Sequence, residues 1–154
     1  MGSMLATVEA WLEDRGWKYE RIPERDVLRF SFQGGDERWM CFAEVQERYE
    51  RVAFYSVAPY NVPEERRPAV AEFVTRVNYG LAIGNFELDY ADGEVRFKTS
   101  LDVKGAELTQ TLVERAVIPN LHAMNTYLAG VAALIGDDGP SPAELCASIE
   151  RSAS

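Results

Sequence analysis

The order of two hydrophobic patterns along the chain is the strongest constraint on its fold. Four segments repeat apolar residues at helical spacing: residues 5–12, 69–81, 108–135 and 142–150. Six segments alternate or concentrate apolar residues in the manner of β-strands: 17–22, 28–32, 38–45, 52–57, 86–90 and 95–97. Strands and helices grouped in this way predict an α+β fold, with a mostly antiparallel sheet of about five or six strands and the helices packed on one face.

Local signals place the ends of several elements. Gly16 follows the first helical segment and is expected to end it in a left-handed conformation. Pro119 falls inside the long helical segment, where it is expected to produce a kink. The sequence Ser141-Pro142-Ala143-Glu144 is a capping box with proline at the first helical position, so it predicts the start of the last helix.

Asp92-Gly93 is a strong signal for a β-hairpin turn. If these two residues form the whole loop, counting outward gives the cross-strand pairs Tyr90–Val95, Asp89–Arg96, Leu88–Phe97 and Glu87–Lys98. The apolar pairs then share the core face, and the opposite charges share the other face. This register predicts a structural role for Glu87 and Asp89 instead of acid–base catalysis, because nearby cations oppose the raised pKa that a catalytic acid needs.

Gly80 and Gly84 raise the question of a glycine-rich ligand loop. They follow a helix and precede a strand, whereas a phosphate-binding loop follows a strand and opens a helix. We therefore expect Gly80 to end the helix in a left-handed conformation and Gly84 to form a tight entry to the next strand.

The residues that most often carry chemistry are sparse. His122 is the only histidine, and no cysteine or acidic residue lies one helical turn from it, whereas a zinc site needs three or four ligands. Cys41 and Cys146 are expected to be buried, reduced thiols. Five aromatic residues are assigned to the sheet core: Phe30, Phe32, Trp39, Phe54 and Tyr55. The sequence therefore predicts no catalytic, cofactor-binding or metal-binding residue, and a protein that is not an enzyme.

Net charge limits the choice of partners. The chain of 154 residues carries 16 basic and 25 acidic residues, a formal net charge of −9. Binding to nucleic-acid phosphates requires clustered lysine and arginine, so no direct nucleic-acid binding is expected. An acidic chain is suited to solubility or to docking on a basic protein surface.

The chain is expected to form one domain over residues 1–154. Residues 1–3 precede a second methionine, Met4, and are typical of residues added in cloning, while residues 151–154 are expected to be a frayed tail. No apolar run approaches the roughly 18 residues of a membrane span, and no signal-peptide pattern precedes the first helix, so we expect no membrane association and a cytoplasmic location.

One stretch resembles a known family. The segment VPEERRPAVAEFVTRVNYGLAIGNFELDYADGEVRFKTS, from Val62 onward, is similar to the YbjN-like proteins of bacteria, most specifically in NYGL (78–81), GNFE (84–87) and DGEVRF (92–97). Members of this family are described as regulators of sensory transduction. The resemblance implies a fold similar to that of type III secretion chaperones, which are small acidic α+β dimers that hold a protein client, and it implies no enzymatic chemistry. The last helix, residues 142–150, departs from the simplest chaperone plan.

Two functional hypotheses follow. The first is a non-catalytic, homodimeric protein-binding module, chaperone-like or a regulatory adaptor, whose apolar groove has an acidic rim and binds a protein client, such as a basic nucleic-acid-handling protein. A homodimer is expected because the helices at 69–81 and 108–135 are apolar over more than one face. The second is a small-ligand sensor or an unrecognised enzyme with a pocket near Tyr79 or His122.

Overall fold

The structure is a computed structural model that describes residues 3–136 and 138–153. Met1, Gly2 and Ser154, which fall in the segments expected to be a cloning addition and a frayed tail, lie outside the described residues. The elements are α1 (Ser3–Asp14), β1 (Glu20–Arg21), β2 (Val27–Gln33), β3 (Arg38–Gln46), η1 (Glu47–Tyr49), β4 (Arg51–Val57), η2 (Glu64–Arg66), α2 (Arg67–Gly80), β5 (Asn85–Leu88), β6 (Val95–Asp102), α3 (Gln110–Ile135) and α4 (Pro142–Ala153).

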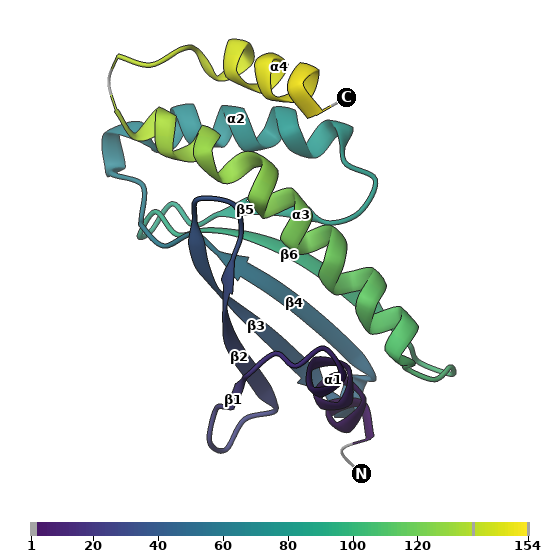
Figure 1. The fold of residues 1–154 in the computed structure, drawn as a ribbon. Coiled ribbons are helices and arrows are strands. Elements are labelled where there is room, and N and C mark those ends of the chain that lie inside the picture. The colour runs from purple at the N-terminus through teal and green to yellow at the C-terminus, as the bar shows by residue number, and fades with distance from the viewer. Residues whose placement is uncertain (1–2, 137, 154) are drawn as a thin grey trace.

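The strands form one antiparallel sheet of six strands in the order β1-β2-β3-β4-β6-β5. The helices pack on one face of the sheet. Figure 1 shows α3 running across the sheet. Helices α2 and α4 lie side by side near the C-terminal end of α3, and α1 lies near its N-terminal end. The predicted α+β class is confirmed, and β4, whose sequence is nearly all apolar, lies inside the sheet between β3 and β6.

Both predicted helix caps are present. The Gly16 amide donates to the Glu13 carbonyl and the Trp17 amide to the Leu12 carbonyl, while Gly16 has φ of 71°, which is the Schellman arrangement. At α4 the Ser141 hydroxyl accepts from the Glu144 amide at 3.1 Å, and the Glu144 carboxylate accepts from the Ser141 amide.

Some predicted boundaries are wrong. The strand expected over residues 17–22 is reduced to Glu20–Arg21. Gly80 is the last residue of α2 and does not adopt a positive φ, whereas Gly84 does, at 77°. A Cβ on Gly84 would lie 2.6 Å from the Phe97 ring, so the tight strand entry is confirmed. Helix α4 continues to Ala153, so residues 151–153 are helical and not a frayed tail.

The predicted hairpin register is wrong by two residues. Leu88 pairs with Val95 and Glu87 with Arg96. The turn is longer than Asp92-Gly93, because the Asp89 carbonyl accepts from the Gly93 amide at 2.7 Å. Since side chains alternate with a period of two, this shift keeps the paired side chains of β5 and β6 on their predicted faces. Tyr90, predicted to face the core opposite Val95, instead lies in the turn and is 56% exposed. Phe97 is fully buried, Leu88 packs against the core, and Glu87 lies on the other face.

The residues Asn78 and Phe86 of the family-like segment make a specific contact between α2 and β5. The Asn78 side-chain amide accepts from the Phe86 backbone amide at 2.7 Å and donates to the Phe86 carbonyl at 3.1 Å. A single side chain therefore satisfies both backbone groups of one residue in an edge strand.

A buried polar network fixes α3 on the sheet. Asn120 is fully buried and donates to the carbonyl of Phe54 on β4 and of Phe97 on β6, both at 3.0 Å. Its side-chain oxygen accepts from the Ser56 hydroxyl at 2.6 Å, and Ser56 in turn accepts from the Trp39 indole. No buried side-chain nitrogen or oxygen in the described residues lacks a hydrogen bond, so the network is complete.

Replacement of Asn120 by alanine should lower the free energy of unfolding by about 2–4 kcal/mol. The variant loses four hydrogen bonds, including one to the Thr99 hydroxyl, and leaves the buried Ser56 hydroxyl without its acceptor. Urea unfolding followed by circular dichroism measures the change. The control is Asn125→Ala on the exposed face of the same helix, where one hydrogen bond to the Gly35 amide is lost and a cost below about 1 kcal/mol is expected. Equal costs for the two variants would contradict the assigned role.

Candidate functional site

The sheet face opposite the helices carries an apolar strip along its two central strands. Its members point away from the core and are half-buried or exposed: Met40, Phe42, Ala53, Tyr55 and Val57. Met40 pairs with Val57, and Phe42 with Tyr55, so the strip consists of adjacent cross-strand pairs. The side chain of Met40 is 38% exposed. We call this set the apolar strip.

Charged side chains flank the strip on β6 and β5. On β6, Arg96 is the cross-strand partner of Val57, and Lys98 is the partner of Tyr55. Both cations bind Glu87, at 2.6 Å and 2.8 Å, and the Arg96 guanidinium also lies over the Tyr55 ring, 4.3 Å from its centre. The side chains beside the strip are therefore locked to one another instead of extending freely into solvent.

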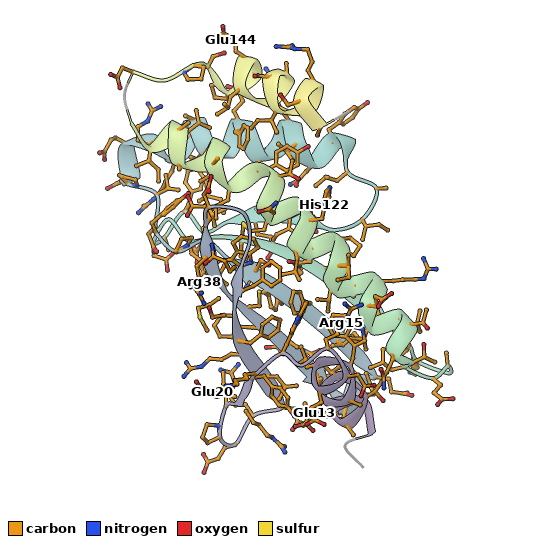
Figure 2. The ribbon with its side chains drawn as sticks, in the orientation of Figure 1. Glu13, Arg15, Glu20, Arg38, His122 and Glu144 are labelled. Carbon is orange, nitrogen blue, oxygen red and sulfur yellow. The ribbon has the colours of Figure 1, made fainter. Side chains whose placement is uncertain are left out.

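A hollow of about 440 Å³ opens at one end of the strip. Its apolar lining includes Met40, Phe42 and Val57, with Arg38 and Glu94 also lining it. The rim thus carries one charge of each sign, and the acidic rim expected from the sequence is not found here. Figure 2 labels Arg38 on the sheet, well separated from α4 and its labelled Glu144.

The carboxylate of Glu87 has a shifted pKa. Partial burial would raise it, but the hydrogen bonds from Lys98 and Arg96 and their charges outweigh burial and hold the pKa below its ordinary value. A catalytic acid needs the opposite shift. The ion-pair role predicted for Glu87 is confirmed, although its cross-strand partner is Arg96 and Lys98 reaches it diagonally.

Of the other chemistry-bearing candidates, Tyr79 and Cys146 line one hollow between α2 and α4, whereas His122 and Cys41 lie elsewhere. His122 is exposed midway along α3 (Figure 2), and Tyr79 is 96% exposed at the end of α2. Cys41 and Cys146 are both unpaired and buried, as predicted, and burial raises the pKa of the Cys41 thiol to about 12. Among the described residues there is no group of three histidine, cysteine or acidic side chains that could hold a metal ion.

The apolar strip was missed in the sequence reading. Phe30, Trp39 and Phe54 are core residues as predicted, and Phe32 packs partly against them, but Tyr55 lies on the open face. A signal was present in segments 38–45 and 52–57, where both sets of alternating positions are largely apolar. Such a pattern is typical of an inner strand. It equally indicates a strand whose second face is apolar without being covered.

Fold and site together define a class: a small α+β protein with helices on one face of an antiparallel sheet and an apolar strip on the other. The family model described as "YbjN: Putative bacterial sensory transduction regulator" matches residues 5–133. The chain therefore belongs to the YbjN family. No curated protein matches this chain closely enough to count as a relative.

Three solved structures share the fold. The crystal structure of YbjN from E. coli, titled "a putative transcription regulator", has a TM-score of 0.65 and 15% identity, and the match covers 84% of this chain and 91% of that one. The Yersinia pestis type III secretion chaperone SycH, solved with a fragment of YscM2, has a TM-score of 0.51 and 12% identity, covering 86% and 99%. The HopA1–SchA chaperone–effector complex has a TM-score of 0.50 and 11% identity, covering 81% and 94%.

The Glu87→Gln variant should lose stability at neutral pH and show a weaker dependence of stability on acid. Because the pKa of Glu87 is lowered in the folded protein, its stabilisation is present at neutral pH and is lost as pH falls below the ordinary carboxyl value of 4.5. Urea unfolding at several pH values from neutral to acid tests this. Lys98→Met, which removes one of the two cations, should reduce the same dependence only in part. An unchanged pH dependence in Glu87→Gln would contradict the assignment.

Proposed function

We propose that this protein is a non-catalytic protein-binding module that acts as a chaperone-like or regulatory adaptor. The observation that carries the proposal is the apolar strip at the centre of a sheet face that no described helix covers. Exposed apolar patches on a protein of this size usually mark partner surfaces. Two proteins that share the fold, SycH and SchA, were solved with protein partners, which supports the same class of role here.

The occupant of the strip is a protein client that contributes an apolar segment. The strip is shallow and spans two strands, which suits a polypeptide better than an enclosed small molecule. The mixed charges of Arg38, Glu94 and Arg96 beside it provide polar contacts for a peptide backbone and its flanking side chains.

The client's charge follows from the whole chain and not from the strip. A net charge of −9 attracts a basic protein over long range, such as a nucleic-acid-handling protein, and speeds its encounter. Because the rim is mixed, added salt should slow association more than it speeds dissociation.

A non-enzymatic role is part of the proposal. It is supported by the exposed position of His122, the deep burial of Cys41 and the lowered pKa of Glu87, none of which suits acid–base or nucleophilic catalysis. In the described residues no helix is both long and apolar enough to cross a membrane. Unpaired Cys41 and Cys146 favour a reducing compartment, so we propose a cytoplasmic location.

The client is tested by capture on the tagged protein from the native host, followed by purification of the captured protein and a binding measurement. Met40→Asp should weaken that binding about tenfold or more, because it places a charge in the strip. Ile118→Asp is the matched control: Ile118 is 39% exposed on α3, against 38% for Met40, and its replacement should leave binding unchanged. A captured protein that binds both variants equally would refute the site.

We also propose a homodimer, at a surface other than the one first expected. The dimer was first expected to form through the apolar faces of α2 and α3. In the structure α4 packs against both helices and covers much of these faces. Beside Tyr79 lies a hollow of about 440 Å³ between α2 and α4, lined by Arg76, Cys146 and Ala147 among others. A projecting ring next to a hollow on one surface is self-complementary, so a two-fold axis places each Tyr79 in the other copy's hollow.

Tyr79→Ala should therefore convert the dimer to a monomer, as measured by light scattering at micromolar concentration. Tyr90→Ala is the control, because Tyr90 is also exposed, at 56%, but lies in the turn between β5 and β6. A monomeric mass for the unaltered protein, or a dimer that survives Tyr79→Ala, would refute the proposed contact.

A further inference from the structure

Helix α4 (Pro142–Ala153) buries far fewer apolar side chains than the helix of equal length at the other end of the chain. Both α1 and α4 have 12 residues. Helix α1 buries five apolar side chains: Met4, Leu5, Val8, Trp11 and Leu12. Helix α4 buries only Cys146, with Leu145 and Ile149 partly buried against the core. It also lies beyond residues 5–133, the part of the chain that the family model matches.

The surface under α4 has a specific notch. Gly130 is buried inside α3, toward its C-terminal end, at a position where glycine weakens a helix relative to alanine. A Cβ on Gly130 would lie 2.7 Å from the Phe73 ring and 2.8 Å from Cδ1 of Ile149, so an added methyl group would force one or both of these side chains to shift. Phe73 and Tyr127 stack edge to face beside it, with ring centres 6.3 Å apart. A branched apolar side chain from a crossing helix thus fits between α2 and α3.

We propose that α4 is a detachable cover on a helix-binding groove formed by α2 and α3. The occupant that replaces it is an amphipathic helix of the protein client. That helix carries a branched apolar residue for the Gly130 notch and apolar residues three and four positions before it, as Ile149, Cys146 and Leu145 do in α4. The identification of the occupant as the client's helix rests on the proposed function, whereas the groove itself does not.

Light packing and tethering together explain how such a cover would work. An element with few buried apolar contacts opens locally without unfolding the rest of the protein. A helix tethered by a short connection competes at an effective concentration of roughly millimolar, so a free helix displaces it only if it binds well or if α4 is weakened. The groove is then protected from weak, nonspecific helices and open to a specific one.

Hydrogen exchange measured by mass spectrometry on the full chain carrying Tyr79→Ala tests the detachment, because the dimer contact proposed at Tyr79 would otherwise hold α4 in place. Peptides from α4 should exchange about 100-fold faster than peptides from α1, while α2 and α3 remain protected. Equal protection of α4 and α1 would overturn the proposal, and so would exchange of α2 and α3 at the rate of α4, because the groove would then not survive opening.

The groove is tested with a fluorescent synthetic peptide of residues 141–153 as the probe. The full chain carrying Leu145→Glu and Ile149→Glu should bind this peptide about tenfold or more tightly than the unaltered protein, because its own α4 no longer competes. Ser148→Glu, on the exposed side of α4, is the matched control and should bind the peptide no better than the unaltered protein. A folded double variant that does not bind the peptide would overturn the proposal.

Gly130→Ala provides an independent variant, which is informative even if the double variant does not fold. Filling the notch should accelerate exchange in α4 and yet prevent binding of the added peptide. If hydrogen exchange in α4 is the same in Gly130→Ala as in the unaltered protein, the proposed role of the Gly130 notch in holding α4 is refuted. A different result would refute only the client's helix as the occupant. In that case the double variant binds the peptide, as expected for a groove, but its affinity for the client equals that of the unaltered protein.

Discussion

The buried amide of Asn120 is the interaction on which the arrangement of the fold depends. Its hydrogen bonds to β4 and β6 fix the rotation and the height of α3 above the sheet, because a slip in either direction would leave a buried polar group unpaired. The other helices α1, α2 and α4 all contact α3. Once α3 is set, the sheet's helical side is filled, and the opposite side remains the face available for binding.

The local parts of the fold could be predicted because their causes are local. The cap at Gly16, the capping box at Ser141 and the core stripe of α2 depend on neighbouring residues and were predicted correctly. The hairpin register failed because the hydrogen bond from Gly93 to Asp89 adds residues to the turn, and a shift of two residues leaves the apolar pattern unchanged.

The candidate site was harder to predict, since it depends on which surfaces are covered. Periodicity shows that a face of α3 or of β3 is apolar, but it does not identify its neighbour. The apolar faces of α2 and α3 led us to expect a dimer surface, yet α4 covers much of them, while Met40 and Phe42 remained unnoticed and lie open. Net charge has the same limit as periodicity, because it does not say where on the surface the charges lie. The chain has a net charge of −9, yet the rim of the hollow at the strip carries both signs of charge.

The bond between Asn78 and Phe86 has a consequence for how chains of this protein meet. An edge strand with free amide and carbonyl groups can recruit a strand from another chain, which leads to aggregation. The Asn78 side chain occupies both groups of Phe86 in the middle of a strand of four residues, so an incoming strand would find no continuous row of bonding groups. The β5 edge of the sheet is thereby protected from pairing with a strand of another chain.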